Sequence, residues 1–244
     1  HLKIIKLSAI DSTNSFLKDL ALTSAIENFT VVAADCQRKG RGQQGSSWVS
    51  EPHKNLIFSV FVRFELFHIS EKRYLNFAVS LAIFEVLSLE NIPGVAIKWP
   101  NDILSGNKKI CGILIETSVK GTEISSAVIG IGLNVNQTDF PASLEKASSL
   151  QLLRGQNFEL DLLLKKIVLK LKLKIALVEA KEFKLLEAAY LHVLYKKNTP
   201  TMFKDSKGTL FMGMVLGISE EGKLQVALED ERILEFGIKE ISFL

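Results

Sequence analysis

The spacing of apolar residues predicts alternating strands and helices along most of the chain. Apolar side chains at helical spacing predict long helices at residues 75–89 and 160–179, and shorter helices after Asp11-Ser12-Thr13-Asn14 and at residues 182–194. This order favours a mixed sheet with flanking helices. Six segments that are β-branched or continuously apolar predict the strands of that sheet: residues 4–10, 30–36, 55–64, 95–99, 109–117 and 123–135.

A different pattern begins after a break at Asn198-Thr199-Pro200. Short apolar runs at residues 201–203, 208–218, 223–228 and 232–236 are separated by turns rich in Asp, Glu, Ser and Gly. This many short strands in so few residues predicts a small β-barrel. The expected fold class is therefore α+β, with a mixed-sheet domain at residues 1–196 and a small β domain at residues 197–244.

The composition is that of an ordinary globular protein. The chain has 244 residues, 47% of them hydrophobic and 23% charged, and this length suffices for a core without a structural metal or disulfide. The longest charge-free stretch, residues 124–138, is too short and too polar for a membrane-spanning helix. The N-terminal residues lack an apolar signal core, and the two cysteines form neither a disulfide framework nor a zinc motif. We therefore expect a cytoplasmic protein without membrane contact.

The formal net charge of +3 is unevenly distributed. Residues 1–159 carry 16 basic and 15 acidic side chains, residues 160–197 carry nine and four, and residues 198–244 carry five and eight. We interpret the lysines of the middle segment as a solvated helix face. Since nucleic-acid binding depends on Lys and Arg neutralising phosphates, the acidic C-terminal segment argues against such a partner.

A glycine-rich loop follows the second predicted strand. Its sequence, Gly40-Arg41-Gly42-Gln43-Gln44-Gly45, matches the G-x-G-x-x-G pattern of dinucleotide sites, but such sites need a helix to begin at the loop. Residues 46–52 have little apolar periodicity and end in a proline, which disfavours a dinucleotide fold. Glycines let backbone amides approach a ligand, and Arg38, Lys39 and Arg41 add positive charge, so an anion site and a plain surface loop both remain open.

Three further segments put polar groups or bare backbone at predicted strands. Lys98-Trp99-Pro100-Asn101-Asp102 ends a buried strand with a lysine, which is costly unless that lysine faces a polar site. Lys109-x-x-Gly112 opens the next strand, and Gly130-Ile131-Gly132 puts two glycines on one strand face. Each segment also has a purely structural explanation: a core tryptophan with a turn cap, a solvated hairpin, or packing against a helix. The four histidines lack ligand spacing, and no nucleophile elbow is present.

Taken in order, these segments resemble the biotin–protein ligases, also called biotin–acetyl-CoA-carboxylase ligases. The resemblance covers nearly the whole chain, and five motifs in order are far more specific than any one of them. It implies a class II synthetase-like catalytic domain of mixed sheet and helices plus an SH3-like C-terminal domain. The matching segments are Asp11-Ser12-Thr13-Asn14, Gln37 with Gly40-Arg41-Gly42 and Gly45-x-x-Trp48, Lys98-Trp99-Pro100-Asn101-Asp102, Lys109-x-x-Gly112-Ile113-Leu114-Ile115-Glu116 and Gly130-Ile131-Gly132-Leu133-Asn134.

The resemblance implies a two-step reaction in one site. The carboxylate of biotin attacks the α-phosphate of ATP, with Mg²⁺ as cofactor, and gives biotinyl-5′-AMP and pyrophosphate. A lysine of the biotin carboxyl carrier domain of a carboxylase then attacks the mixed anhydride, and AMP leaves. Fixed cations and amides must offset the repulsion between two anions, and a closing loop must keep water from the adenylate.

The resemblance also implies residue roles. The catalytic residues would be Lys109, Arg41, Lys98 and Asp102, with Lys109 the first choice for the cation at the reacting oxygens. No dedicated metal site is expected, and Mg²⁺ would be reached only through Asp102. The residues expected to bind biotin are Ser12, Thr13, Asn14, Gln37, Gly40, Arg41, Gly42, Lys109, Gly112, Leu114, Gly130 and Gly132. The residues expected to bind ATP are Gln43, Gly45, Trp48, Lys98, Asn101, Lys109 and Asn134.

Two departures from the family pattern affect these expectations. Gln43 stands where many relatives carry arginine, so either Arg41 or a neutral Gln43 would meet the reacting oxygens. The sequence ends at Leu244, where some relatives continue with a basic residue that contacts nucleotide. Because the first motif begins at Asp11, we expect no N-terminal helix-turn-helix and hence no DNA binding. The enzyme is expected to be a monomer or a homodimer.

Two rival functions fit less well. A lipoate–protein ligase or octanoyltransferase shares the fold and the acyl-transfer logic, but residues 98–102 and the loop with Trp48 favour biotin. A noncatalytic module that binds ligand or nucleic acid would use the small β domain, whose net negative charge disfavours a phosphate partner.

Overall fold

The larger of two sheets has seven strands, and the computed structural model describes it within residues 2–244. The strands lie in the order β1-β2-β3-β7-β6-β5-β4, in which β1 and β2 are parallel and all other neighbours antiparallel. The bounds are β1 (Ile4–Leu7), β2 (Val31–Ala34), β3 (Leu56–Arg63), β4 (Val95–Lys98), β5 (Asp102–Ser105), β6 (Lys108–Lys120) and β7 (Glu123–Leu133).

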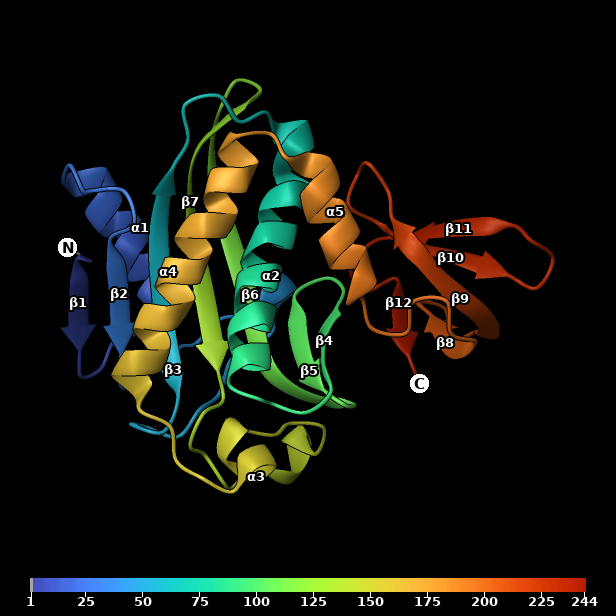
Figure 1. Ribbon diagram of the computed structural model, residues 1–244, viewed down its shortest axis with the longest axis horizontal. Helices are drawn as coiled ribbons and strands as arrows, with labels where there is room; N and C mark the ends of the chain where they lie inside the picture. The colour runs from blue at the N-terminus through green and yellow to red at the C-terminus, as the bar shows by residue number, and fades with distance from the viewer. Residues whose placement is uncertain (1) are drawn as a thin grey trace.

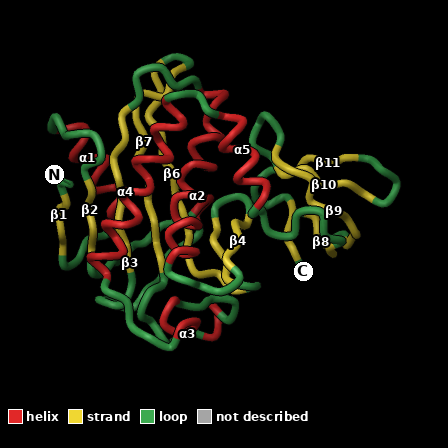
Figure 2. Tube along the Cα trace, in the orientation of Figure 1, coloured by secondary structure: helices red, strands yellow, loops and turns green. Residues whose placement is uncertain are grey.

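Helices cover both faces of this sheet unequally. On the face toward the viewer in Figures 1 and 2 lie α2 (Lys72–Leu89), α4 (Leu160–Glu179) and α5 (Phe183–His192). The other face carries α1 (Thr13–Thr23), whose Leu17 packs with Val32, Phe61 and Val128 in a small separate cluster. The short helix α3 (Leu150–Arg154) lies below the sheet, and one-turn 3₁₀ helices occur at Gln43–Gly45, Ile69–Glu71 and Ala142–Leu144.

Strand alternation explains why a pocket forms on the α1 face. Ile129 and Ile131 of β7 are buried in the main core on the α2 and α4 side. Gly130 and Gly132 lie between them and therefore face the opposite way. Gly130 is paired with Ser59 of β3, so this part of the α1 face carries small or absent side chains. The surface beside the N-terminus of α1 is therefore hollowed.

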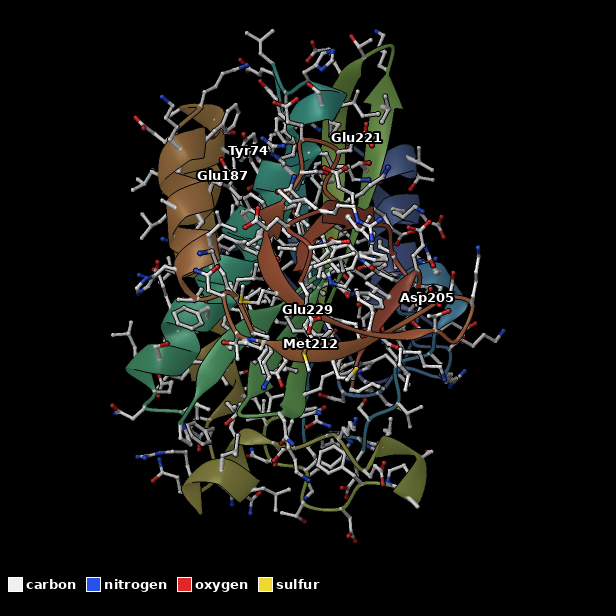
Figure 3. All side chains as sticks on the ribbon, turned by 90° about the vertical axis from the view of Figure 1, so that its right-hand side faces the viewer. Tyr74, Glu187, Asp205, Met212, Glu221 and Glu229 are labelled. Carbon is white, nitrogen blue, oxygen red and sulfur yellow. The ribbon has the colours of Figure 1, made fainter. Side chains whose placement is uncertain are left out.

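The second sheet is five-stranded and antiparallel, in the order β11-β10-β9-β8-β12. Its bounds are β8 (Thr201–Asp205), β9 (Leu210–Ile218), β10 (Leu224–Leu228), β11 (Ile233–Phe236) and β12 (Ile241–Phe243). Phe203 is fully buried there and packs on the rings of Phe211 and Phe243. In Figure 3 this sheet faces the viewer, with the acidic residues Asp205, Glu221 and Glu229 around it.

The small sheet docks beside the end of β4. Trp99 Nε1 donates to the carbonyl of Gly222 at 3.0 Å, and Lys98 Nζ lies 5.1 Å from the ring centroid of Phe243. Asn198 N donates to the carbonyl of Val215 at 2.9 Å, at the point where the chain enters the small sheet. These contacts fix the small sheet against the motif at residues 98–102.

The α+β fold expected from the sequence is confirmed. All predicted helices and strands form, with ends shifted by a few residues, while β5, β12 and α3 were not anticipated. The predicted division at residues 196/197 falls between α5 and β8 and remains a prediction. Among residues 2–244 no helix combines the length and the apolar character that crossing a membrane requires.

Candidate functional site

A pocket of about 560 Å³ lies on the α1 face of the large sheet, within the usual range for small-molecule sites. Its walls come from the N-terminus of α1, residues 41–43 and 46–48, the end of β4, the starts of β5 and β6, and residues 130–132 of β7. The small sheet closes one side with Lys204, Asp205 and residues 238–243. Its polar lining differs between the end beside α1 and the opposite end.

The end beside α1 is a fully connected hydrogen-bond network. Ser12 is the N-cap of α1 and accepts from Ser15 N, which orients the next two side chains toward the sheet. Thr13 N donates to Gln37 Oε1 at 2.8 Å, and Ser59 Oγ lies 2.8 Å from Thr13 Oγ1 and 2.5 Å from Asn14 Oδ1. Since Ser59 is fully buried and Asn14 only 3% exposed, this network is part of the folded framework.

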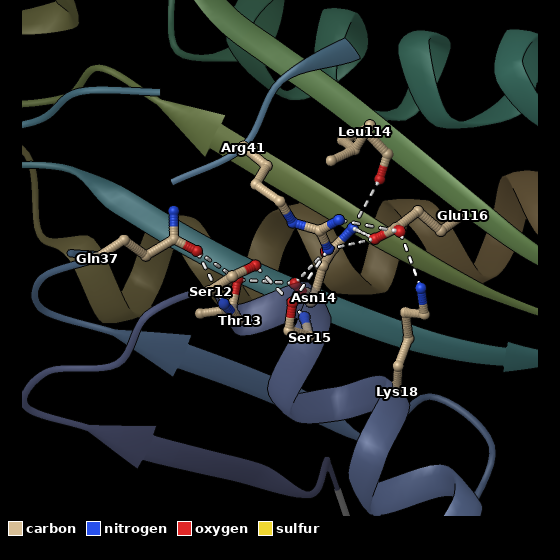
Figure 4. Close-up of polar contacts among 10 residues, drawn as sticks. Ser12, Thr13, Asn14, Ser15, Lys18, Gln37, Arg41, Leu114 and Glu116 are labelled. Atoms are coloured by element: carbon tan, nitrogen blue, oxygen red, sulfur yellow. Dashed lines mark hydrogen bonds and ion pairs between the residues drawn. The ribbon is translucent and has the colours of Figure 1, made fainter. Parts of the chain in front are cut away.

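Glu116 of β6 joins this network to two cations (Figure 4). Its carboxylate accepts from Asn14 Nδ2 at 2.9 Å, from Lys18 Nζ at 2.9 Å and from Arg41 Nη2 at 2.9 Å. Burial alone raises the pKa of Glu116, but the hydrogen bonds from Lys18 and Asn14 and the charge of Arg41 outweigh it and hold the pKa below its usual range. Arg41 Nη2 also donates to Ser15 Oγ at 3.1 Å. The guanidinium is thus engaged at the edge of the pocket.

Residues 40–48 form a small hairpin, which we call the hairpin 40–48. Trp48 N donates to Gly40 O at 2.9 Å and Gly42 N donates to Ser46 O at 2.6 Å. A Cβ at Gly132 would lie 2.4 Å from the Trp48 indole, and a Cβ at Gly112 would lie 3.0 Å from it. The two glycines therefore let the indole lie directly on the backbone of β6 and β7, and a ligand on this surface must lie beside the indole or move it.

Two lysines and one carboxylate meet at the opposite end of the pocket. The antiparallel pairing of β4 with β5 sets Lys98 opposite Asp102, and the pairing of β5 with β6 sets Asp102 opposite Gly112. Lys109 Nζ lies 2.7 Å from Asp102 Oδ1 and 5.8 Å from the Trp48 ring centroid. Burial lowers the pKa of Lys98, partly offset by the charge of Asp102. Two cations therefore flank one carboxylate around the space that a ligand can enter.

Three buried polar atoms at this end have no hydrogen-bond partner within residues 2–244. They are Trp48 Nε1, Gln43 Oε1 and Asp102 Oδ1, whose contact with Lys109 is ionic without hydrogen-bond geometry. Buried polar groups are normally paired, so unpaired groups that line a pocket indicate where a ligand supplies the partners. The lining thus combines fixed cations with a donor and acceptors that await a polar molecule.

Comparison with known proteins places this pocket in a family. The sequence profile of the biotin/lipoate A/B protein ligase family matches residues 7–134. The chain is 30% identical over 243 residues to the bifunctional ligase/repressor BirA of Bacillus subtilis, covering 98% of this chain and 71% of that protein. The chain belongs to the biotin/lipoate A/B protein ligase family. The predicted family membership is therefore confirmed.

Two further similarities refine this assignment. The biotin–[acetyl-CoA-carboxylase] ligase of Paracoccus denitrificans is 34% identical over 131 residues, which cover 53% of each chain. The biotin protein ligase of Aquifex aeolicus, solved in complex with biotin and ATP, superposes with a TM-score of 0.81 at 26% identity, covering 100% of this chain and 99% of the other. The family fold therefore extends over the small sheet as well as the large one.

Most residues that sequence reasoning singled out come together in the pocket. Three lie outside its lining: Gly40, whose Cβ would meet Trp48 O at 2.4 Å, Gly45 at the hairpin tip, and Asn134, which is 4% exposed and donates to Ser148 O. Gly130 lines the pocket but makes room for Asn14, whose Oδ1 a Cβ would meet at 2.4 Å. The lining includes Ser12, Thr13, Asn14, Gln37, Arg41, Gly42, Gln43, Trp48, Lys98, Asn101, Asp102, Lys109, Gly112, Leu114, Gly130 and Gly132.

Sequence reasoning missed several site residues. Ser59 is the one polar residue among the buried positions 56–62 of β3. A buried polar residue needs a hydrogen-bond partner, and this could have been noticed in the sequence. Glu116 lay within a matched motif but received no role. Lys204 and Lys239 line the pocket from the small sheet, and nothing in their local sequence distinguishes them from solvated lysines.

The described residues offer no ready-made metal cage. Within residues 2–244, no group of three or more His, Cys, Asp or Glu side chains converges. Asp102 and Asp205 are the carboxylates that line the pocket. Magnesium is commonly held by one or two carboxylates together with substrate phosphates, and this donor set fits that mode.

Proposed function

We propose that this chain is an ATP-dependent biotin–protein ligase. It joins biotin and ATP into biotinyl-5′-AMP and then transfers biotin to a lysine of a biotin carboxyl carrier domain. The observation that carries the proposal is the convergence of all five family motifs on one pocket, with Lys98, Lys109 and Asp102 at its unpaired end. The biotin- and ATP-bound relative with the same fold over its whole length supports this choice of substrates.

In the first step, two anions must approach one another. An oxygen of the biotin carboxylate forms a bond to the α-phosphorus of ATP, and the bond from that phosphorus to the pyrophosphate oxygen breaks. Lys109 is well placed to offset this repulsion, because its ammonium group projects into the pocket beside Trp48. Lys98 adds a second charge nearby. Transition-state stabilisation of this kind requires fixed charges, and the ion pair with Asp102 fixes Lys109.

In the second step, a neutral lysine amine of the carrier domain attacks the acyl carbon of the adenylate. The C–N bond forms, the C–O bond to AMP breaks, and the proton that the amine loses passes to solvent water. Asp102 Oδ1 is buried, and within the described residues its contact is the ion pair with Lys109 at 2.7 Å; its remaining lone pair is suited to orient an incoming N–H. We assign Asp102 this role.

Magnesium belongs to the proposal only as a companion of ATP. Mg²⁺ bound to the phosphates would neutralise charge that develops on the leaving pyrophosphate. Asp102 and Asp205 are the residues that would hold it. The lysines and hairpin 40–48 act independently of that assignment, since they orient the two substrates and exclude water.

The biotin ring system fits best at the paired end of the pocket. Thr13, Asn14 and Ser59 already satisfy one another there, and their remaining lone pairs can accept from the N–H groups of a cyclic urea. At the other end, Trp48 and Gln43 would meet the nucleotide. With the ring system at the paired end, the carboxylate of biotin would point toward Lys109.

The proposal is tested by two assays on the full chain. Biotin-dependent exchange between ATP and pyrophosphate measures adenylate formation, and incubation with biotin, Mg-ATP and a biotin carboxyl carrier domain measures transfer. Exchange with lipoate and not biotin would assign the chain to the lipoate branch of its family. Exchange without transfer to any carrier would remove the second half of the proposal.

Three sequence-based expectations accompany the proposal. They are a cytoplasmic location, a monomeric or homodimeric state, and the absence of a DNA partner. The comparison with BirA of B. subtilis makes the last of these worth testing, because that relative is a ligase and a repressor. Specific binding of this chain to a biotin-operon operator in a gel-shift assay would contradict the expectation.

A further inference from the structure

The turn between β11 and β12 holds one lysine in an unusual backbone conformation. Lys239 has a φ of +66°, in the left-handed region that non-glycine residues seldom adopt. The turn is braced from within, because Gly237 N donates to Glu240 Oε2 at 2.6 Å and Glu240 N donates to Gly237 O at 3.2 Å. The side chain of Lys239 is therefore presented from a preformed turn.

This lysine reaches the tip of the hairpin 40–48. Lys239 Nζ donates to the carbonyl of Gln44 at 2.5 Å, although the two residues are 195 positions apart. Gln44 itself has a φ of +47° at the centre of the 3₁₀ turn Gln43–Gly45. That carbonyl is directed away from the hairpin and toward the small sheet.

Within residues 2–244, this is the sole hydrogen bond that joins residues 42–46 to another part of the chain. The other hydrogen bonds of these residues stay inside the hairpin: Gly42 N to Ser46 O, Ser46 N to Gln43 O and Ser46 Oγ to Gln43 O. The base of the hairpin is held elsewhere, by Arg41 on Glu116 and by the Trp48 indole on Gly132. Among the described residues, the small sheet thus supplies the one hydrogen bond that ties the tip to the rest of the chain.

We propose that Lys239 is a positioning residue that latches the hairpin 40–48 over the pocket. The inference rests on the proposed function, because a closed hairpin matters most when a reactive adenylate must be kept from water and from release. The small sheet is itself fixed on the Trp99–Gly222 and Lys98–Phe243 contacts, so the latch transmits the position of the strand end at Lys98 to the hairpin tip. The small sheet therefore positions both Lys98 and the tip of the hairpin 40–48.

The latch is polar and solvent-exposed, which suits a cover that must open. A hydrogen bond from a charged donor to an exposed carbonyl has a modest net value, so substrates can enter and products leave. Loop closure of this kind isolates reactive intermediates and completes a site. Loss of the latch should leave the chemistry in place and shift the hairpin toward open states.

The first test is independent of catalysis. Residues 42–46 contain no trypsin site, so limited digestion of the ligand-free protein with proteinase K, a protease of broad specificity, followed by mass spectrometry, reports how often the hairpin tip opens. We expect Lys239→Met to raise the cleavage rate within residues 42–46 by about fivefold, the factor of one average hydrogen bond. Lys239→Arg keeps a charged donor and should restore most of the protection.

The matched control is Lys207→Met, which removes an exposed lysine from another turn of the same sheet. It should leave hairpin cleavage unchanged. Equal cleavage in wild type and Lys239→Met would overturn the proposal, and so would faster cleavage in Lys239→Met that Lys239→Arg does not reverse. Because no substrate is present, either result leaves the ligase assignment intact.

The second test follows the adenylate. With biotin and Mg-ATP but no carrier domain, Lys239→Met should release biotinyl-5′-AMP into solution about fivefold faster than wild type, when each rate is divided by the amount of enzyme-bound adenylate in the same variant. Unchanged release would contradict the latch. Exchange lost in every variant and in wild type would instead contradict the ligase function.

Discussion

The two ends of the pocket differ in how completely their polar atoms are paired. Beside α1, Asn14 is 3% exposed and bonds to Ser59, Glu116 and the carbonyl of Leu114. At the other end, the inaccessible atoms Trp48 Nε1 and Gln43 Oε1 have no hydrogen-bond partner within residues 2–244, and Asp102 Oδ1 has only its ion pair with Lys109. Folding thus supplies the hydrogen-bond partners at the end beside α1, whereas at the other end it leaves polar atoms that a ligand can pair.

This difference predicts which substitutions change the stability of the protein and which change its turnover. A satisfied buried network is rigid, and removing one member leaves the others unpaired, so substitutions there act on stability. Unpaired groups beside fixed cations contribute little to folding and gain their partners from a ligand, so substitutions there act on turnover. A substitution at the unpaired end should therefore change the rate of the reaction, and a substitution at the paired end should change the free energy of unfolding.

The largest effect is expected from Lys109→Met at the unpaired end. The substitution keeps the aliphatic stem and removes the charge beside Asp102. We expect adenylate formation to fall by about 10²- to 10³-fold, the usual consequence of removing one group that stabilises developing charge. Biotin-dependent ATP–pyrophosphate exchange measures it, and the midpoint of urea unfolding should barely move.

The neighbouring Lys108 provides a matched control. It is exposed, and its Nζ donates to the carbonyl of Glu145, outside the pocket. Lys108→Met should retain the exchange rate of the wild-type protein. An equal loss in both variants would mean that general charge, and not the position of Lys109, governs the reaction.

Local sequence identified Lys98, Asp102 and Lys109 but not how they meet. Their encounter depends on β5, a four-residue strand that pairs with β4 on one side and β6 on the other. The sequence Pro100-Asn101-Asp102 favours a turn, so local propensity predicts a stop and not a new strand. Pairing with two neighbours outweighed that preference, and the register of such pairing is a property of the sheet rather than of the segment.

The next effect is expected at the paired end, from Gly130→Ala. An added Cβ would lie 2.4 Å from Asn14 Oδ1, so the Asn14 side chain must move and lose contacts with Ser59 or Glu116. We expect the free energy of unfolding to fall by about 1–3 kcal/mol, the cost of overpacking combined with a broken buried hydrogen bond. Urea unfolding followed by circular dichroism measures this loss.

Gly217→Ala is the matched control for that loss. Gly217 also lies in a strand, but its Cβ would meet the nearest atom, Leu191 Cδ2, at 3.6 Å, an ordinary contact distance. We expect little change in the unfolding midpoint. If Gly130→Ala were as stable as Gly217→Ala, the Asn14 network would be adaptable and the paired end would not be rigid.

A smaller effect is expected from Arg41→Ala, which lies between the two ends. Its guanidinium is bound to Glu116 and Ser15, so it anchors the base of the hairpin 40–48 and is 43% exposed. We expect the KM for biotin to rise about three- to tenfold, with kcat for adenylate formation nearly unchanged, because an anchoring interaction is present before and during the reaction. A kcat reduced a hundredfold or more would show that Arg41 meets the reacting oxygens, as the family resemblance implies.

The connections made by the paired end and by the small sheet were the least predictable from sequence. Asn14 and Ser59 are 45 positions apart, and Lys239 and Gln44 are 195 apart, so no local pattern links them. Motif residues were predictable because their spacing reflects a shared chemistry. Their supporting partners were not, because a polar residue such as Ser59 gives a sign that a partner exists but not where it lies.

The smallest effect concerns the acid sensitivity of the paired end. The pKa of Glu116 lies below its ordinary value of 4.5, because the hydrogen bonds from Lys18 and Asn14 and the charge of Arg41 exceed the effect of burial. A carboxyl group with a depressed folded-state pKa stabilises the protein above its unfolded-state pKa, and that contribution is lost as the pH falls through the folded-state value. Wild type should therefore be more stable than Glu116→Gln near neutral pH, by about 1 kcal/mol or less because Lys18 and Arg41 are half exposed. Urea unfolding of both proteins at pH 7 and at successive pH values below 4.5 measures this difference in stability. The difference should shrink toward zero as the pH falls. If it stayed constant with pH, the Glu116 charge would contribute nothing to the framework around Asn14.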